Sequence, residues 1–185
     1  ELLQEVPQKV QEVYATADWI AESGDLLKQV NCVSVDEAML EKISLLSTPN
    51  KVVALVKQFE AADNIELKNQ IVLALDGIQD PGNLGTIIRI ADWFGVHQIV
   101  CSHDTAELYN PKVVQSTMGS IARVGVVYKN LAEWLPAAKN EVRTYATALD
   151  GMDVTSDKKI KEGVIIIGNE SKGVSPRLLE MANVK

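Results

Sequence analysis

The sequence predicts an α/β protein in which a small layered domain precedes a doubly wound, mostly parallel α/β domain. Segments with strand and helix patterns alternate along most of the 185 residues, which is typical of layered α/β folds. The run IVLALDG at 71–77 is apolar throughout, as in strands buried on both faces of a parallel sheet. A polar, aperiodic stretch at 60–70 separates the two series and is interpreted as a linker.

The small domain is predicted over residues 1–59. Asp36 is suited to cap its second helix. The chain opens at ELLQEV, which has the pattern of the end of a helix, so we expect the start of this domain to be missing. The predicted strands are 10–16, 31–35 and 50–59, and the predicted helices are 18–30 and 34–46.

The larger domain is predicted over residues 71–185. Its glycine-rich turns, 77–85 and 168–173, both follow predicted strands, and ligands of open parallel sheets bind at the carboxyl ends of strands. The predicted strands are 71–77, 97–102, 125–128, 143–149 and 163–170, and the predicted helices are 83–94, 111–124, 131–140 and 175–182.

Composition excludes several classes of protein. No apolar run approaches the roughly 20 residues that span a membrane. Cys32 and Cys101 lack paired spacing, so neither disulfides nor a zinc site are indicated and a reducing cytoplasm is expected. His97 and His103 are too isolated to indicate a metal. The net charge of −7 lies mainly in residues 1–69, which carry −6, so it does not exclude RNA as a partner of the larger domain.

The first glycine-rich turn leads into a helix with one unusual cation. In DPGNLGTIIRIADWFG, an apolar stripe follows helical spacing, Asn83 is suited to cap the start and Gly95 to end the helix. Arg89 lies off the stripe. Two interpretations stay open: a surface ion pair with Asp92 or Asp76, or a side chain that reaches back to the mouth of the turn. The residues of the stripe are Leu84, Ile87, Ile88, Ala91 and Phe94.

The second glycine-rich turn, IIIGNESKGVSP, places a carboxylate at the end of a very apolar strand. Glu170 there needs hydrogen-bond partners such as loop N–H groups, which predicts a rigid loop. Neither turn matches the dinucleotide fingerprint or the P-loop, so NAD and nucleoside triphosphates are poorly supported. No nucleophile elbow is present.

These residues resemble the SpoU (TrmH-like) branch of the SPOUT methyltransferases. DPGNLGTIIRIADWFG is similar to the first motif of that family, YNPKVVQSTMGS at 109–120 to the segment that follows, and IIIGNESKGVS to the second motif. The likeness covers about 71–185, and the two motifs in this order are specific. The front domain resembles the L30e-like substrate-binding domain often attached to these enzymes.

The resemblance implies S-adenosylmethionine-dependent methylation of a ribose 2′-hydroxyl in RNA, a C-terminal trefoil knot and a homodimer. By residue, it implies a catalytic Arg89 and Asn83. The implied cofactor-binding residues are Ala148, Leu149, Gly168, Asn169, Glu170 and Gly173, with Glu170 bracing the loop. Lys112 and Ser116, and the cluster Lys158, Lys159 and Lys161, are candidate phosphate contacts, although the cluster could equally be a solvated loop.

One departure from the family concerns the end of the chain. The third motif of the family, a serine-leucine-asparagine segment, should follow the strand that starts at Val184, and the sequence stops there. We therefore expect an incomplete knot and weak binding of S-adenosylmethionine by residues 1–185.

The sequence leaves two questions open. Ribosomal RNA is favoured over transfer RNA only by the front domain, and a non-catalytic RNA-binding relative is the other alternative. Arg89 is proposed in the family to help remove the hydroxyl proton, but arginine side chains stay protonated in proteins. A phosphate clamp that stabilises the developing alkoxide is the alternative role.

Overall fold

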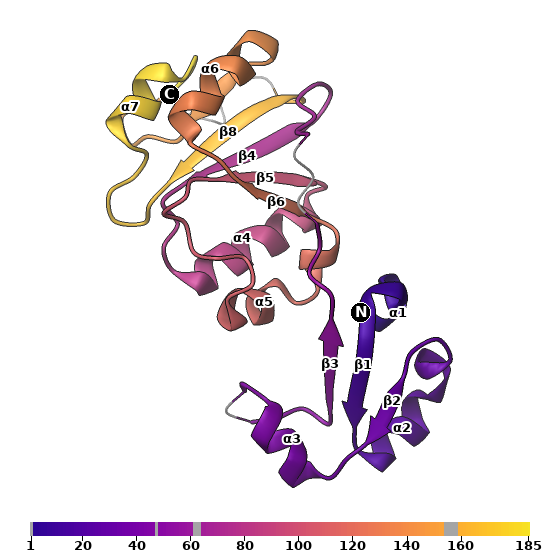
Figure 1. The fold of residues 1–185 in the computed structure, drawn as a ribbon. Helices are drawn as coiled ribbons and strands as arrows, with labels where there is room; N and C mark the ends of the chain where they lie inside the picture. The colour runs from indigo at the N-terminus through magenta and orange to yellow at the C-terminus, as the bar shows by residue number, and fades with distance from the viewer. Residues whose placement is uncertain (1, 47, 61–63, 154–158) are drawn as a thin grey trace. The chain divides into compact units, whose positions relative to one another are not determined.

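The computed structural model describes residues 2–46, 48–60, 64–153 and 159–185. The chain divides into two compact units, Glu1–Glu60 (unit 1) and Ala61–Lys185 (unit 2), whose elements are labelled in Figure 1. Each unit has its own sheet.

Unit 1 is built on a three-stranded sheet in the order β2-β1-β3, with β1 parallel to β2 and antiparallel to β3. Asp36 caps α3, as predicted, by accepting a hydrogen bond from the Met39 N–H at 2.8 Å. The predicted helix 18–30 is shorter and divided into an α-helix and a 3₁₀ turn. The elements are α1 (Leu2–Glu5), η1 (Pro7–Lys9), β1 (Val10–Ala15), α2 (Ala17–Ser23), η2 (Gly24–Leu27), β2 (Cys32–Ser34), α3 (Glu37–Ile43) and β3 (Val52–Val56).

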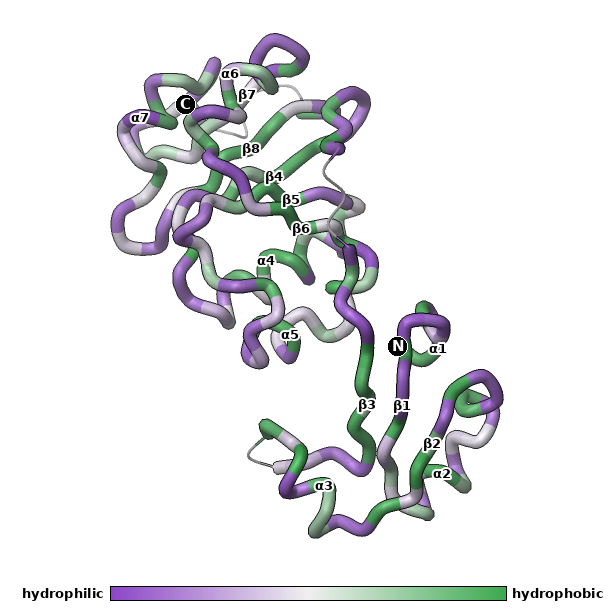
Figure 2. The backbone as a smooth tube through the Cα atoms, viewed as in Figure 1, coloured by the Kyte–Doolittle hydropathy of each residue, from purple (hydrophilic) through white to green (hydrophobic). Residues whose placement is uncertain are grey.

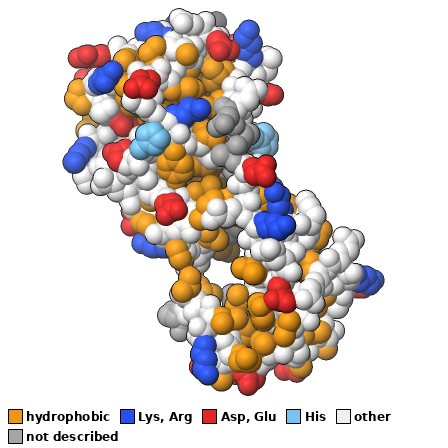
Figure 3. Space-filling model, viewed as in Figure 1, with side chains coloured by type: hydrophobic (Ala, Val, Ile, Leu, Met, Phe, Trp, Pro, Cys, Tyr) orange, Lys and Arg blue, Asp and Glu red, His pale blue; other side chains and the backbone are white. Residues whose placement is uncertain are grey.

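The core of unit 1 is small. Val13, Ala15 and Leu40 are buried, and hydrophobic side chains gather on the face of unit 1 that Figure 3 shows. Leu45 and Leu55 are 80% and 52% exposed. The sheet and helices of unit 1 therefore leave part of its apolar surface uncovered.

Unit 2 is a five-stranded sheet in the order β6-β5-β4-β8-β7, and every neighbouring pair is parallel. The predicted mostly parallel α/β domain is confirmed. The elements are β4 (Ile71–Asp76), α4 (Pro81–Trp93), β5 (Gln98–Cys101), α5 (Pro111–Thr117), η3 (Ser120–Ala122), β6 (Gly125–Tyr128), α6 (Leu131–Glu141), β7 (Thr144–Ala146), β8 (Gly163–Gly168) and α7 (Pro176–Met181).

Helices cover both faces of this sheet. In Figure 1, α4 and α5 lie on one face, and α6 and α7 lie on the other. The central strands are hydrophobic along their length (Figure 2), because their side chains meet helices on both sides. Val72, Ala74 and Ile166 from the strands pack with Leu135 and Leu178 from the helices in one core cluster.

The predicted helix 111–124 is interrupted. Met118 and Gly119 adopt left-handed backbone angles, with φ of 52° and 93°, and two such residues in a row end an α-helix. The short η3 turn follows. Its Ser120, together with Arg123 just after it, faces Asp92 near the end of α4.

Part of the predicted linker packs on unit 2. Leu67 is buried, and Ile65 packs against the same core cluster. The side chain of Gln98 accepts a hydrogen bond from the Glu66 N–H at 2.9 Å and donates to the Asn64 carbonyl. This part of the predicted linker is therefore held on unit 2 by two apolar side chains and by hydrogen bonds to Gln98.

The last described residues return to the sheet. Val184 forms a parallel bridge with Tyr145 of the edge strand β7, in agreement with the strand expected to begin there. Of the helices in the described ranges, none combines the length and apolarity needed to cross a membrane.

Candidate functional site

The two glycine-rich turns begin at the carboxyl ends of neighbouring strands. β4 and β8 pair in register from Ile71 with Gly163 to Asp76 with Gly168. Both strands run in the same direction, so the turns that follow them lie at one edge of the sheet. This is the edge at which open parallel sheets bind ligands.

Asp80, and not Asn83, caps α4. The Asp80 carboxylate accepts a hydrogen bond from the Asn83 N–H at 3.0 Å, and Pro81 occupies the first position of the helix. The predicted cap at Asn83 is wrong, because an aspartate followed by proline starts the helix earlier. The backbone N–H of Asn83, and after it the Lys112 ammonium, hold the pKa of Asp80 below its usual value.

Asn83 instead connects the two turns. Its side-chain amide donates a hydrogen bond of 2.8 Å to Oε1 of Glu170, which is 87 residues away in the chain. Both side chains are exposed. The structure thereby brings together one predicted catalytic residue and one predicted cofactor-binding residue.

The turn after β8 closes tightly on itself. Asn169 and Gly173 exchange two backbone hydrogen bonds, of 3.0 and 2.8 Å. A Cβ atom on Gly168 would lie 2.0 Å from the Gly173 carbonyl carbon, and Gly173 has a φ of +70°. Only glycine fits at the first position, and the second favours it strongly.

Asn169 braces this loop from inside. Its side-chain oxygen accepts from the Ser171 and Lys172 N–H groups, and its amide donates to the Gly77 carbonyl at 2.7 Å. The bracing role expected for Glu170 is therefore performed by Asn169. An exposed Glu170 keeps its hydration and needs no loop N–H groups, whereas the half-buried Asn169 satisfies both ends of its amide.

Three polar residues at this edge were not predicted as site residues. Asp76 accepts a hydrogen bond from the Ser175 N–H at 2.7 Å. Ser102 accepts from the Gly77 N–H at 2.8 Å and donates to Asp104 at 2.5 Å. Their signal in the sequence was their position at the ends of β4 and β5, the same rule that selected the two turns.

Arg89 is exposed, and the surface ion pair considered for it does not form. Asp92 is bonded to Arg123 instead, with Nη2 to Oδ2 at 2.7 Å, and Asp76 bonds Ser175. Within the described part of the chain, no group accepts a hydrogen bond from the Arg89 side chain. The guanidinium is thus available to an external anion.

The two candidate substrate contacts lie differently. The Lys112 ammonium is 3.3 Å from the Asp80 carboxylate, in an exposed pair of small energetic weight. Ser116 lies where α5 contacts α4: a Cβ atom added to Gly85 would lie 2.5 Å from the Cβ atom of Ser116. Lys112 is therefore accessible, whereas Ser116 is half-buried against α4.

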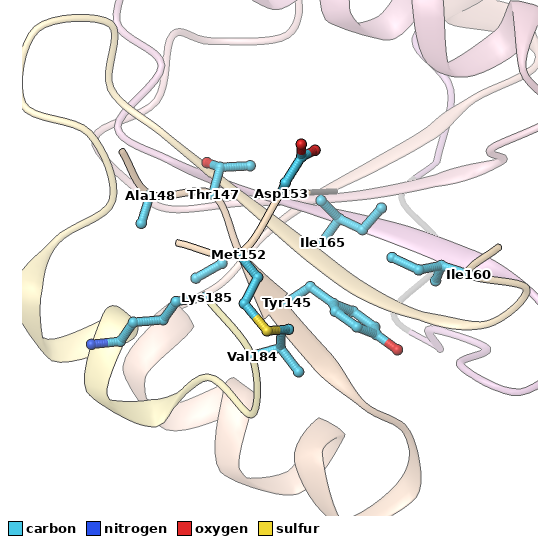
Figure 4. Close-up of a pocket in the computed structure, with 10 residues that line it drawn as sticks. Tyr145, Thr147, Ala148, Met152, Asp153, Ile160, Ile165, Val184 and Lys185 are labelled. Carbon is cyan, nitrogen blue, oxygen red and sulfur yellow. The ribbon is translucent and has the colours of Figure 1, made fainter. Parts of the chain in front are cut away.

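A cavity of about 320 Å³ opens beside the end of β7. Figure 4 shows Thr147 and Ala148 on one side and Met152, Tyr145 and Val184 around it. Most of its lining is apolar, and the lining also includes Thr147, Asp153 and Lys185. Of the residues predicted to hold a cofactor, Ala148 lines this cavity.

The other predicted cofactor residues lie outside that cavity. Leu149 is fully exposed. Asn169 and Gly173 line a separate hollow of about 190 Å³ together with Asp76 and Asp104. The structure therefore places Ala148 and the 168–173 loop at adjacent strand ends without a shared cavity among the described residues.

The remaining groups at this edge are a buried thiol and scattered His, Asp and Glu side chains. Burial raises the pKa of the Cys101 thiol to about 12, so it stays protonated and unreactive. In the ranges that the structure describes, no group of three or more His, Cys, Asp or Glu side chains is arranged to hold a metal ion.

The fold and the site together define a class of protein: a parallel α/β domain with two glycine-rich turns joined at its carboxyl edge and an unpaired arginine on the helix after the first turn. The sequence profile of the SpoU rRNA Methylase family matches residues 70–185. The chain belongs to this family.

The chain is also similar to two curated relatives and to one solved structure. A 23S rRNA (guanosine(2553)-2′-O)-methyltransferase, RlmP of Bacillus subtilis, is 33% identical over 86% of this chain. A 23S rRNA (uridine(2479)-2′-O)-methyltransferase of Streptomyces viridochromogenes is 30% identical over 69% of this chain. The crystal structure of an AdoMet-bound rRNA methyltransferase from Sinorhizobium meliloti superposes with a TM-score of 0.80 at 26% identity, over 99% of this chain and 73% of that one.

The chain spans 64% of the length of the Bacillus relative and 48% of the Streptomyces relative. Likeness of this extent defines the family.

Proposed function

We propose that the protein transfers a methyl group from S-adenosylmethionine to a ribose 2′-hydroxyl of RNA, with 23S ribosomal RNA as the substrate. The observation that carries this proposal is the 2.8 Å hydrogen bond from Asn83 to Glu170. It joins the two motifs of the family at one edge of the sheet, and its donor Asn83 lies on the same helix, α4, as Arg89. The names of the two relatives, both 23S rRNA 2′-O-methyltransferases, support the substrate.

The residues present fit one part of a site for the methyl donor. The 320 Å³ cavity beside β7 lies within the roughly 300–1,000 Å³ range of small-molecule sites, and its apolar lining suits an adenosine moiety. Ala148 would hold it from the end of β7, and Asn169 would keep the neighbouring 168–173 loop in place. When bound, S-adenosylmethionine supplies a methyl group on a positively charged sulfur.

Arg89 and Asn83 act on the RNA in this proposal. Arg89 binds the phosphate next to the target ribose with two parallel hydrogen bonds and stabilises negative charge as the hydroxyl loses its proton to solvent and takes the methyl group. Asn83, held by Glu170, orients the ribose, and a fixed geometry removes much of the entropic cost of bringing two reactants together.

The trefoil knot belongs to this proposal as well. Residues at the end of the chain pass close to the loop after β7: the Met152 N–H donates to the Lys185 carbonyl at 2.9 Å, and a Cβ on Gly151 would lie 2.7 Å from the Lys185 carbonyl carbon. Such a close approach is what threading of the chain behind that loop requires.

The assembly and setting complete the proposal. We infer a homodimer in the cytoplasm, in which unit 1 is an L30e-like domain that binds the RNA substrate. The likeness to the Sinorhizobium structure over 99% of the chain includes unit 1 and supports its role as a regular part of such enzymes. Cys32 and Cys101 are both free thiols, in keeping with a reducing compartment.

The test is methyl transfer by the full-length protein from labelled S-adenosylmethionine to purified 23S rRNA, with transfer RNA as the second substrate. We expect label in 23S rRNA at a nucleotide that resists alkaline hydrolysis, because a methylated 2′-oxygen cannot attack the phosphate. Label in transfer RNA alone would show that transfer RNA, and not 23S rRNA, is the substrate. RNA binding without any label would favour a non-catalytic relative.

A further inference from the structure

A basic groove lies at the opposite edge of the sheet from the glycine-rich turns. It has a volume of about 530 Å³ and is formed where α6 ends and where β7 and β8 begin. We call it the amino-edge groove. Its charged lining residues are Lys139, Arg143, Lys159, Lys161, Glu141 and Glu162.

The cations of this groove are mostly without partners. Arg143, Lys159 and Lys161 are exposed, and their side chains form no ion pair or hydrogen bond with any other group that the structure describes. Lys139 donates to the Met181 carbonyl at 2.9 Å, which leaves its charge uncompensated. On the acidic side, Glu162 already accepts a hydrogen bond from the Asn69 N–H at 2.9 Å.

This concentration of positive charge is unusual for the chain. Residues 61–185 carry 13 Lys and Arg against 15 Asp and Glu, yet the groove has four cations and two carboxylates. Elsewhere in the unit, cations such as Arg123 and Lys112 are paired with carboxylates. A site that gathers unpaired cations in a hollow attracts an extended anion.

The position of the groove indicates the kind of anion. It shares Tyr145 and Ile160 with the cavity beside β7. A chain of phosphates that passes along it would therefore run next to the proposed methyl-donor site. Positively charged grooves that track the backbone, with an aromatic side chain for stacking, are typical of single-stranded nucleic-acid sites.

We propose that the amino-edge groove binds the phosphate backbone of the RNA substrate at nucleotides that flank the methylated one, through Arg143, Lys159 and Lys161. This inference rests on the proposed function, since it assigns a second contact of the same RNA. Of the two interpretations of the lysine cluster, phosphate contacts or a solvated loop, it selects phosphate contacts for Lys159 and Lys161. Lys158 lies outside the described residues.

The test combines Arg143→Gln, Lys159→Gln and Lys161→Gln in the full-length protein. These exposed side chains have no partners to lose, so the thermal unfolding temperature should be unchanged. We expect RNA affinity to fall at least about tenfold at physiological salt, and the slope of log K against log salt to decrease by about 1 for each lost phosphate contact. At saturating RNA, kcat should be retained while KM rises.

The matched control is Lys159→Arg with Lys161→Arg, which keeps both charges and should keep RNA affinity and the salt slope. If the unaltered protein methylates RNA and the triple glutamine variant keeps the same RNA affinity and salt slope, the groove is not an RNA site. The proposed function would then still stand. If the unaltered protein transfers no methyl group but the triple variant binds RNA more weakly, the proposed function is overturned. The groove would then still be an RNA site.

Discussion

The two edges of the unit 2 sheet use their polar residues in opposite ways. At the carboxyl edge, Asn169, Asp76 and Ser102 are bonded to loop backbone, and Asn83 is bonded to Glu170. At the amino edge, the cations of the groove beside β7 and β8 have few partners. The carboxyl edge is therefore fixed before any ligand arrives, whereas the amino edge can adapt to one.

This difference fits two different tasks. Chemistry requires groups whose positions are set in advance, because reorganisation during the reaction raises the barrier. Attraction of a flexible polyanion requires charge more than geometry, and lysine supplies a point charge on a flexible stem. Arg89, on the helix that begins at the carboxyl edge, is an exception: its guanidinium has no hydrogen-bond acceptor among the residues that the structure describes.

Arg89 gives the sharpest contrast between the two edges. We expect Arg89→Ala to lower kcat about 10²–10³-fold, the usual effect of removing one stabilising donor, and Arg89→Lys to lower it at least about tenfold because lysine cannot make two parallel bonds. Single-turnover methyl transfer measures both. Arg143→Lys, the matched change at the amino edge, should keep kcat; near-normal turnover by Arg89→Lys would rule out the clamp.

The rigidity of the carboxyl edge depends on Gly168. A Cβ there would overlap backbone of the same loop at 2.0 Å, so Gly168→Ala should lower the free energy of unfolding by about 3 kcal/mol, at the upper end for overpacking. Urea denaturation measures this. Gly125→Ala is the control, because the nearest atom to its new Cβ would be the His97 carbonyl oxygen at 3.6 Å, and its stability should be unchanged within about 0.5 kcal/mol.

An ion pair at the far end of α4 makes stability depend on pH. Hydrogen bonds from Arg123 above all, and from Ser120, hold the pKa of Asp92 below its usual 3.8. A carboxyl whose pKa is lowered by folding stabilises the protein above its unfolded pKa, and this contribution is lost as pH falls below about 3.8 toward the folded value.

Asp92→Asn should therefore destabilise the protein by about 2 kcal/mol at neutral pH, as expected for a hydrogen bond to a charged group, and by less at pH 3. Thermal unfolding at several pH values measures the difference. Asp150→Asn, at an exposed carboxylate, is the control. An equal loss for Asp92→Asn at both pH values would show that the pair contributes through packing and not through charge.

The smallest effect concerns the link between the two turns. In a double-mutant cycle of Asn83→Ala and Glu170→Ala, we expect a coupling energy of about 1 kcal/mol in kcat/KM, typical of residues in direct contact. The exposed position of both side chains keeps the value small. Strictly additive effects would mean that the bond does not orient Asn83 during the reaction.

Much of the site could be predicted from local sequence. Gly168 and Gly173 were selected because glycines after a buried strand indicate a turn, and the turn requires them. The cap of α4 was misplaced by three residues, since Asp80 and Asn83 are both good capping residues and only the chain direction at Pro81 decides between them. The lack of an ion pair between Arg89 and Asp92 could not be predicted either. Asp92 pairs with Arg123 instead, and Arg123 follows the left-handed residues Met118 and Gly119, which the apolar periodicity does not predict.

By itself, the sequence determined the class of unit 2, the places of its two turns and the residues that the family motifs mark. These follow from short-range rules: apolar runs form buried strands, and glycines permit tight turns. The tertiary structure alone decided which groups meet. Strand order put Asp76 opposite Gly168 and brought Asn83 to Glu170. It also gathered Arg143 and Lys159 into one groove, because contacts between distant segments depend on how strands pair and not on any local pattern.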